Sequence, residues 1–331
     1  RSNVAHILST NSVGPAWGPN VNGAVLALAI SGSTVYVAGD FDAVNGVYRS
    51  RLAAIGTNGT LLDWNPSANG PVSAIAVSGT SVYIGGNFSS ISGIARANLA
   101  SVGADGVGAV VNWDPAPNGP VYDLVASGNT IYVGGGFTGI GAQPRNRLGA
   151  VGTDGTVLAW NPNANGNVYA LEMSGSTIYI GGDFSTVSGQ SRGRLASVGT
   201  DGTLHAWNPN PDAGVRAIAV SGSTVYIAGV FFGVGGSPTS ANSPRRGLAA
   251  IDAAGVVTPW NPNANGYAQA LAISGTTIYA GGGFSSIGAV PRQFLASITP
   301  NGALGSWSPQ PNNPVYALAL SNNTIYVGGD F

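Results

Sequence analysis

Two residue types are missing from this chain of 331 residues: it has no cysteine and no lysine. The absence of cysteine excludes disulfide bonds, thiolate metal sites and cysteine nucleophiles. All 12 cationic side chains are therefore arginine, and Glu172 is the only glutamate among the 13 acidic residues. Because lysine and glutamate are common on the exposed faces of helices, their scarcity disfavours a helical fold.

Charge is also scarce, since charged residues make up 8% of the chain and the formal net charge is −1. An average soluble domain has about 25% charged residues. The chain lacks the basic surface that binds nucleic acid through its phosphates, so we expect no nucleic-acid partner. It also lacks a run of about 18 apolar residues and a basic amphipathic helix, so we expect no insertion into a membrane.

What the chain does contain is a repeat of about 47 residues. Its tryptophans are 47, 49, 47, 47, 53 and 47 positions apart, and a set of tyrosines has the same six spacings. The tryptophans are Trp17, Trp64, Trp113, Trp160, Trp207, Trp260 and Trp307, and the tyrosines are Tyr36, Tyr83, Tyr132, Tyr179, Tyr226, Tyr279 and Tyr326. The repeats start near Arg1, Arg49, Arg96, Arg145, Arg192, Arg245 and Arg292. The whole chain is therefore predicted to be one domain of seven repeats.

Every apolar run in the repeat is four to seven residues long, rich in Val, Ile, Tyr and Ala, and bounded by Gly, Asn, Ser or Pro. This composition is typical of strands rather than helices. We predict four strands per repeat, for example Val121–Ser127, Thr130–Phe137, Arg147–Gly152 and Thr156–Trp160. A group of four short antiparallel strands that recurs about every 40 to 50 residues is typical of a propeller blade. The sequence therefore predicts an all-β, seven-bladed β-propeller.

The two ends of the chain hold complementary halves of a repeat. The N-terminal end supplies the last two strands of a blade, Asn3–Ser9 and Val13–Trp17, and the C-terminal end supplies the first two, Val315–Ser321 and Thr324–Phe331. Pairing these halves in a 2+2 arrangement closes the ring and leaves no exposed sheet edge. The same halves can instead pair between neighbouring molecules, and a head-to-tail exchange that does not close makes a filament.

Three segments end in the repeat tryptophan: LAAIGTNGTLLDW (52–64), LGAVGTDGTVLAW (148–160) and LAAIDAAGVVTPW (248–260). They resemble the tryptophan-docking repeat of quinoprotein-like propellers. The whole repeat, with its WNPNANG and Y-x-GG-x-F segments, more closely resembles the bacterial delta-60-type surface propellers. The resemblance implies that the tryptophan packs between blades and that the strand after WNPNANG lies innermost. Quinoprotein dehydrogenases have eight blades and Glu, Asn and Asp ligands to calcium; with seven repeats and one glutamate here, no such ligand is assigned and no cofactor is predicted.

The repeated arginines and tryptophans have two interpretations each. A ring of guanidinium groups could bind an anionic ligand, or each could brace its neighbouring loops by donating to carbonyls or to an aspartate such as Asp40, Asp183 or Asp330. Presence in every blade favours the structural role, because a binding site usually needs differences between blades. The indoles could form a stacking platform, but one at the end of each last strand favours packing between blades.

A feature confined to one blade is a better candidate for a binding site. Phe231 and Arg245 are 14 positions apart, whereas the equivalent residues of other repeats are 8 apart. The candidate binding residues of this longer loop are Phe232, Ser237, Thr239 and Asn242. A tolerated surface insertion is the competing interpretation. Loops such as Asn161–Gly166 and Phe184–Arg192, rich in Asn, Ser, Arg and Gly, suit hydrogen bonding to glycans, or form turns that satisfy their own backbone.

The sequence gives little support for catalysis. His6 and His205 lie at non-equivalent positions of their repeats, and neither is followed by residues at the spacing of metal ligands. Glu172 has no acidic neighbour at a fixed spacing in the sequence that could act with it as an acid–base pair. No catalytic residue and no metal site is assigned.

The sequence therefore predicts a non-enzymatic binding or structural module. An extracellular or cell-surface location is expected, because low charge, the lack of lysine and short neutral loops suit exposure to solvent and proteases. As a structural module it would assemble with copies of itself or with surface proteins, into a filament or a surface layer, since low charge removes one barrier to association. Glycans are the other partner class. The competing hypothesis is a quinoprotein-like or lyase-like enzyme with its site at the mouth of the axis.

Overall fold

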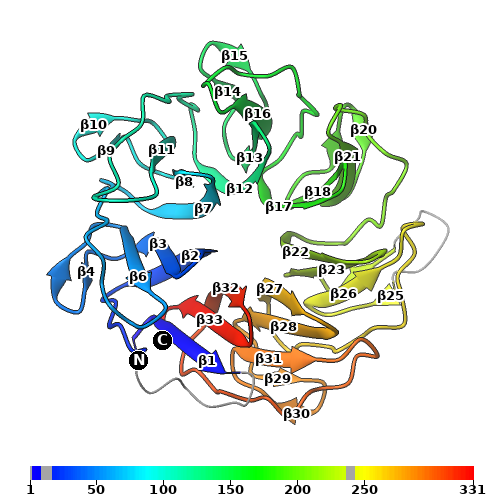
Figure 1. The fold of residues 1–331 in the computed structure, drawn as a ribbon. Coiled ribbons are helices and arrows are strands. Elements are labelled where there is room, and N and C mark those ends of the chain that lie inside the picture. Colours follow the sequence, from blue (N-terminus) through cyan, green and yellow to red (C-terminus); the bar gives the residue numbers. More distant parts are fainter. Residues whose placement is uncertain (1, 9–16, 236–242) are drawn as a thin grey trace. The chain divides into compact units, whose positions relative to one another are not determined.

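The computed structural model describes residues 2–8, 17–235 and 243–331, and within these ranges the chain forms strands and turns without a helix. The chain divides into two compact units. One comprises Arg1–Asn161 with Tyr316–Phe331, and the other comprises Pro162–Val315. In both units, three-stranded sheets alternate along the chain with short two-stranded hairpins (Figure 1). The predicted all-β class is therefore confirmed.

The first unit holds four of the three-stranded sheets among the described residues. In strand order they are β2 (Ala24–Ser31), β3 (Thr34–Asp40) and β6 (Leu52–Gly56); β7 (Val72–Ser78), β8 (Ser81–Gly86) and β11 (Leu99–Gly103); β12 (Val121–Ser127), β13 (Thr130–Gly135) and β16 (Leu148–Gly152); and β32 (Val315–Ser321), β33 (Thr324–Gly329) and β1 (Val4–Leu8). The hairpins are β4 (Ala43–Val44) with β5 (Val47–Tyr48), β9 (Ser90–Ile91) with β10 (Ile94–Ala95), and β14 (Gly139–Ile140) with β15 (Gln143–Pro144).

The second unit repeats this plan. Its sheets are β17 (Val168–Ser174), β18 (Thr177–Gly182) and β21 (Leu195–Gly199); β22 (Val215–Ser221), β23 (Thr224–Gly229) and β26 (Leu248–Ile251); and β27 (Ala268–Ser274), β28 (Thr277–Gly282) and β31 (Leu295–Ile298). The hairpins are β19 (Thr186–Val187) with β20 (Gln190–Ser191), β24 (Gly233–Val234) with β25 (Ser243–Pro244), and β29 (Ser286–Ile287) with β30 (Val290–Pro291). These hairpins lie within segments that the sequence predicts as loops.

The first two strands of each sheet are joined by a tight turn. Between β12 and β13, Gly128 has a φ of +53° and connects Ser127 to Thr130 through a two-residue loop. Glycine is favoured there because it adopts a positive φ without steric cost. Neighbouring sheets contact each other through their first strands: β2 with β7 and β7 with β12 in the first unit, and β17 with β22 and β22 with β27 in the second (Figure 1).

In the six repeats whose last segment the structure describes, the predicted fourth strand is reduced to a single bridge with the third strand. The segment Thr156–Trp160 makes a single bridge, between Val151 and Val157, and the sheet ends at three strands. The Leu158 carbonyl, which would accept the next ladder hydrogen bond, instead accepts one from Nη2 of Arg145 at 2.7 Å. A backbone carbonyl that is satisfied by a side chain no longer needs a partner strand. The repeat arginine therefore ends the pairing that a fourth strand would extend.

The first strand of the chain adds to its last hairpin. β1 pairs antiparallel with β33, from Val4↔Gly328 to Leu8↔Thr324. The predicted strand Asn3–Ser9 is therefore present as β1, and β32 has the bounds predicted for it. Of the other predicted N-terminal strand, residues 13–16 lie outside the described residues.

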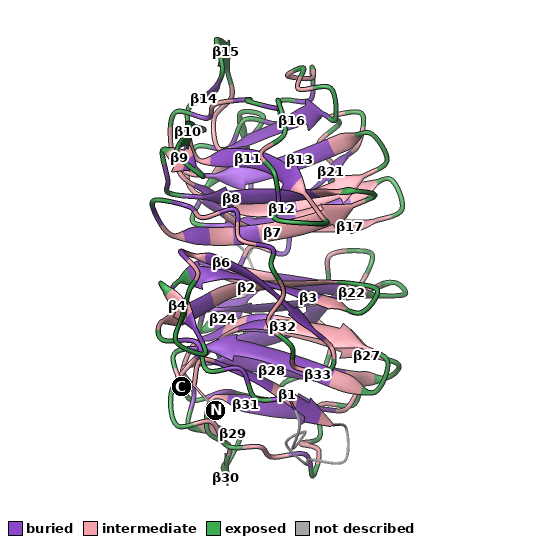
Figure 2. Ribbon diagram, turned by 60° about the vertical axis from the view of Figure 1, so that its left-hand side comes forward, coloured by how far each residue is buried: buried purple, intermediate pink, exposed green. Residues whose placement is uncertain are grey.

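A tyrosine and a tryptophan from each repeat form much of the core. The Trp64 indole lies edge-on to Tyr36 with ring centroids 5.0 Å apart, and its Nε1 donates to the Gly103 carbonyl in the next sheet at 2.7 Å. The other edge-on pairs have centroid separations of 5.0 to 5.2 Å: Trp17 with Tyr326, Trp113 with Tyr83, Trp160 with Tyr132, Trp207 with Tyr179, Trp260 with Tyr226, and Trp307 with Tyr279. All these indoles are buried, as are the central strands (Figure 2). The indoles are core groups that tie one sheet to the next rather than a stacking surface.

Candidate functional site

The repeat arginines donate to backbone carbonyls. Nη1 of Arg192 donates to the Ser191 carbonyl at 2.9 Å, and its Nη2 donates to the His205 carbonyl at 2.7 Å. The same two contacts are made by Arg49, Arg96, Arg145, Arg245 and Arg292. Arg1 lies outside the described residues. In this geometry each guanidinium braces its own repeat, joining the outer hairpin to the bridging segment before the tryptophan.

An asparagine of the WNPNANG segment is used in a similar way. Oδ1 of Asn165 accepts from the backbone N–H groups of Ser185 and Thr186 at 2.8 and 2.9 Å, and its Nδ2 donates to Oγ of Ser185 at 2.9 Å. The equivalent contacts are made by Asn22, Asn69, Asn118 and Asn265. These five asparagines therefore each hold the loop after the second strand of a sheet, and Asp212 takes this place after β23.

Among the candidates in the long loop, Phe232 is described, whereas Ser237, Thr239 and Asn242 lie outside the described residues. The Phe232 side chain is 63% exposed, and the Arg246 guanidinium lies 5.4 Å from the centroid of its ring. Its backbone N–H donates to Oδ1 of Asp212 at 2.9 Å. The backbone position of Phe232 is therefore fixed while its ring faces solvent.

The side chains that change from repeat to repeat lie at a β-bulge in the first strand of each sheet. In β22 the register passes from Val215 to Ala217, so that Arg216 has no partner in β23. The residues skipped in this way are Leu26, Ser73 and Tyr122 in the first unit, and Tyr169, Arg216 and Gln269 in the second. A bulge leaves its extra residue out of the ladder and redirects its side chain. One structural position therefore presents different chemistry in different repeats.

Two of these bulges line an open hollow of about 360 Å³ in the second unit. Its walls are Arg216 of β22, Gln269 of β27, Tyr267 just before β27, and Val230 just after β23. Together they offer a guanidinium, an amide, a phenol and an aliphatic group. Such a mixture can form hydrogen bonds to a polar ligand and also contact its C–H groups.

Arg216 is held in place by two neighbours. Its Nη2 lies 3.4 Å from Oδ2 of Asp183, and its guanidinium carbon lies 3.8 Å from the centroid of the Tyr169 ring. Nδ2 of Asn167 in turn donates to the Tyr169 hydroxyl at 3.2 Å. Because the ring fixes the plane of the guanidinium and Asp183 fixes one end, the group is oriented before any ligand binds.

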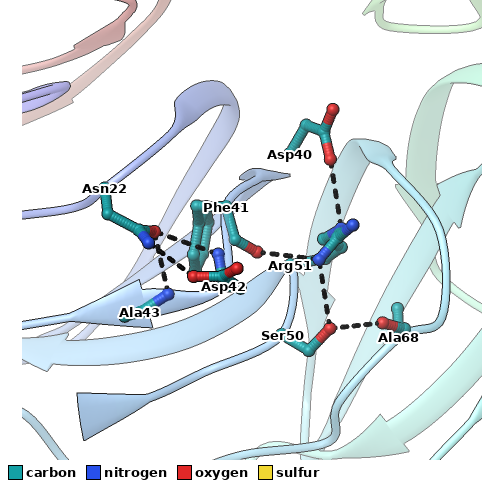
Figure 3. Close-up of polar contacts among 8 residues, drawn as sticks. All are labelled: Asn22, Asp40, Phe41, Asp42, Ala43, Ser50, Arg51 and Ala68. Carbon is teal, nitrogen blue, oxygen red and sulfur yellow. Dashed lines mark hydrogen bonds and ion pairs between the residues drawn. The ribbon is translucent and has the colours of Figure 1, made fainter. Parts of the chain in front are cut away.

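The first unit has a smaller hollow of about 160 Å³ at the equivalent loops, lined by Asn22, Asp40, Phe41, Asp42 and Arg51. Figure 3 shows that its polar groups contact one another. Nε of Arg51 lies 3.1 Å from Oδ1 of Asp40, Nη1 of Arg51 donates to the Phe41 carbonyl at 3.3 Å, and Nδ2 of Asn22 donates to Asp42. This hollow is an internally paired network, in contrast to the larger one.

Comparison with known proteins identifies the architecture. Residues 34–61 and 177–204 match a family model described as a domain of unknown function (DUF5122) beta-propeller. No curated protein is significantly similar to this chain. Among solved structures, the WD40 beta propeller domain of Doa1 is 13% identical with a TM-score of 0.65, over 99% of this chain and 94% of that one. The fold is a β-propeller.

Two further solved structures resemble this propeller. The computationally designed Ika8 protein is 15% identical with a TM-score of 0.59, over 93% of this chain and 94% of that one. BamB from Moraxella catarrhalis is 16% identical with a TM-score of 0.53, over 98% of this chain and 90% of that one. At these identities the likeness establishes the fold and carries no information on activity.

Sequence reasoning missed the hollow of this propeller. The sequence predictions rest on what the repeats share and on one difference in loop length. Arg216 and Gln269 instead occupy a position that recurs at the repeat spacing but holds a different residue type in different repeats. A signal was available. The residue directly after the first buried Val or Ala of this strand is Leu26, Ser73, Tyr122, Tyr169, Arg216, Gln269 and Tyr316 in successive repeats, while most of the positions that follow it vary little.

Ionisable groups of the propeller are shifted mainly by burial. Burial lowers the pKa of His6, whose ring lies 5.3 Å from that of Tyr326. Burial also raises the pKa of six tyrosines: Tyr36, Tyr132, Tyr179, Tyr226, Tyr279 and Tyr326, with a further contribution from Asp105 at Tyr36. None of these residues lines the larger hollow.

The described ranges contain neither a cluster of metal-binding residues nor a membrane-spanning helix. Residues 2–8, 17–235 and 243–331 contain no group of three or more His, Asp or Glu residues placed to hold a metal ion. In the same part of the chain there is no helix long and apolar enough to cross a membrane.

Proposed function

We propose that this β-propeller is a non-enzymatic binding module outside the cell or on its surface, and that the hollow lined by Arg216, Val230, Tyr267 and Gln269 binds a glycan. One observation carries the proposal. The walls of the hollow come from positions that change between repeats, whereas the polar side chains that all repeats share are directed at the protein's own backbone. Repeat scaffolds typically bind through such variable positions on a constant frame.

The chemistry of the hollow suits a hydroxyl-rich ligand. The amide of Gln269 and the hydroxyl of Tyr267 both donate and accept hydrogen bonds, as sugar hydroxyls do. The ring of Tyr267 and the side chain of Val230 offer apolar surface to the C–H face of a sugar. The low charge of the chain and its short neutral loops support a place outside the cell.

We further propose that the chain forms seven blades in a closed ring of the tryptophan-docking, delta-60-type surface propellers. The support is the set of seven repeat tryptophans and the pairing of β1 with β33, which adds the N-terminal strand to the last repeat. In this arrangement the ends of the chain share one blade, and no first or last sheet edge is left open.

A glycan array followed by titration calorimetry tests the binding function. We expect the Gln269→Ala variant to bind the best glycan about 5-fold more weakly, since about 1 kcal/mol is lost with one hydrogen bond. The Ser73→Ala variant is the matched control, because it changes the bulge residue of β7, outside the hollow. Binding that survives Gln269→Ala unchanged, or an array without any bound glycan, would count against the proposed site.

A second candidate function is self-assembly into a filament or surface layer. It is favoured by apolar side chains on the outer hairpins: Val47, Tyr48, Ile94 and Val290 are 46 to 64% exposed. Exposed apolar groups of this kind can pack against another copy of the chain.

Light scattering together with negative-stain electron microscopy tests assembly. A concentration-dependent mass that falls to one chain in a Val47→Ser/Tyr48→Ser variant would support it. A wild-type protein that stays at 32.9 kDa at all concentrations would reject it.

A further inference from the structure

We propose that the hollow at Arg216 recognises the carboxylate of an acidic sugar, that is, a uronic acid residue of an oligosaccharide. This inference rests on the proposed function, because it names the ligand class of the same site.

The free edge of Arg216 is the first argument. A guanidinium carries five N–H donors in a planar fork. Asp183 takes one Nη2 contact at 3.4 Å, Tyr169 covers one face, and among the described residues the Arg216 side chain has no other hydrogen-bond partner. The donors that remain belong to a side chain that lines the hollow. A carboxylate can accept two parallel hydrogen bonds from a guanidinium.

The balance of charge is the second argument. In the first unit, Asp40 pairs with Arg51, and the two charges cancel. Arg194 is the counterpart of Arg51 in the second unit, and its backbone pairs with the residues on both sides of Asp183. Among the described residues, however, the Asp183 carboxylate pairs with Arg216 and not with Arg194. The contact between Asp183 and Arg216, at 3.4 Å, is longer than the 3.1 Å contact between Asp40 and Arg51, and it uses one of the two Nη groups of Arg216, so the guanidinium can still bind a ligand carboxylate.

The remaining walls favour a sugar acid over a small anion. The Tyr267 ring lies directly against Gly283, where any side chain would collide with it. Because glycine leaves this room, the ring keeps its place in the wall of the hollow, which it lines together with Gln269 and Arg216. A ligand that places its carboxylate on Arg216 can therefore place ring hydroxyls against Gln269 and Tyr267 and its C–H groups against Val230. The hollow is open, so neighbouring sugars of a chain can extend into solvent.

The experiment compares matched pairs of ligands. Oligosaccharides of galacturonic, glucuronic and mannuronic acid are titrated into the protein beside the same oligosaccharides with each carboxyl reduced to a primary alcohol. We expect at least one acidic form to bind about 10- to 100-fold more tightly than its reduced counterpart, the range typical of hydrogen bonds to charged groups. The preference should shrink at about 1 M salt, where charges are screened beyond about 3 Å.

Variants assign the preference to Arg216. Arg216→Gln should bind the acidic and reduced forms equally, and Arg216→Lys should lose most of the preference, because an ammonium keeps the charge but lacks the planar fork. Ser73→Ala should keep the wild-type preference. Thermal unfolding of each variant, compared with wild type, separates loss of binding from loss of folding.

The outcomes separate the two proposals. If acidic and reduced forms bind equally and both require Gln269, the acidic-sugar inference is wrong and the glycan-binding function stands. If the acidic preference persists in folded Arg216→Gln, the assignment to Arg216 is wrong. If neither these ligands nor the neutral glycans of the array bind, both proposals fail.

Discussion

Arg145 illustrates how a single side chain shapes its repeat. It donates to the carbonyls of Pro144 and Leu158 at 2.8 and 2.7 Å, and by doing so it closes the outer hairpin onto the bridging segment. The second of these bonds is partly buried, where an unpaired carbonyl is costly. The recurrence of this arginine in the repeats is thus explained by the backbone carbonyls that it satisfies.

We predict that Arg145→Lys lowers the free energy of unfolding by about 1 to 3 kcal/mol, because one ammonium cannot reach both carbonyls and one acceptor is left without a partner. Urea denaturation followed by tryptophan fluorescence measures the change. The matched control is Arg246→Lys, since Arg246 is exposed and its guanidinium contacts the exposed ring of Phe232. Equal stability losses in the two variants would contradict the bracing role.

At the scale of elements, adjacent sheets meet through a glycine and a valine. A Cβ placed on Gly181 of β18 would lie 2.7 Å from Cγ1 of Val215, which belongs to the next sheet. At the following joint the pair is Ala228 and Ala268, which lie in one buried cluster. The two contacts fill the same space with different side chains. At the first, Gly181 has no side chain and Val215 fills the space; at the second, Ala228 and Ala268 each contribute one methyl group.

This comparison predicts compensation between sheets. Gly181→Ala should destabilise the fold by about 1 to 3 kcal/mol through overpacking. Combined with Val215→Ala, it should cost less than the sum of the two single changes, because the double variant reproduces the Ala228 and Ala268 pair. A double-mutant cycle from denaturation midpoints measures the coupling. Strict additivity would show that the two residues do not share this contact.

At the scale of the whole molecule, the lack of lysine leaves the alkaline range to tyrosine. Burial raises the pKa of the six tyrosines from Tyr36 to Tyr326 named above, so the folded state keeps their protons to a higher pH than the unfolded chain does. Above pH 10, the ordinary pKa of tyrosine being about 10, the unfolded chain binds fewer protons than the folded protein does. The free energy of unfolding therefore falls as the pH rises from the ordinary pKa of tyrosine to its raised pKa in the folded state.

We predict that the free energy of unfolding decreases as the pH rises above about 10, the ordinary pKa of tyrosine. Denaturant titrations at a series of pH values measure it, and absorbance at 295 nm should show a late phase of tyrosine ionisation that coincides with unfolding. Tyr326→Phe, which removes one of the six groups with a raised pKa, should make the late phase smaller. Complete tyrosine ionisation in the folded protein would contradict the prediction.

The sequence was a good guide to what every repeat must do and a poor guide to what one repeat does alone. The spacing of Trp64 and its equivalents predicted the propeller, because packing between sheets requires the same group in every repeat. The fourth strand was wrong because propensity does not show that the Arg145 guanidinium satisfies the Leu158 carbonyl. The hollow was missed because a bulge at Arg216 is a matter of register, and register depends on two strands together.

The bulges in the first strands also bear on how such a protein can be changed. Tyr169, Arg216 and Gln269 have no partner residue in the neighbouring strand, so replacing them disturbs no side-chain pair across the ladder. Specificity and foldability are therefore encoded at separate positions. A combinatorial library restricted to these three sites would sample new recognition surfaces on a constant frame, and most of its members should unfold near the melting temperature of the parent.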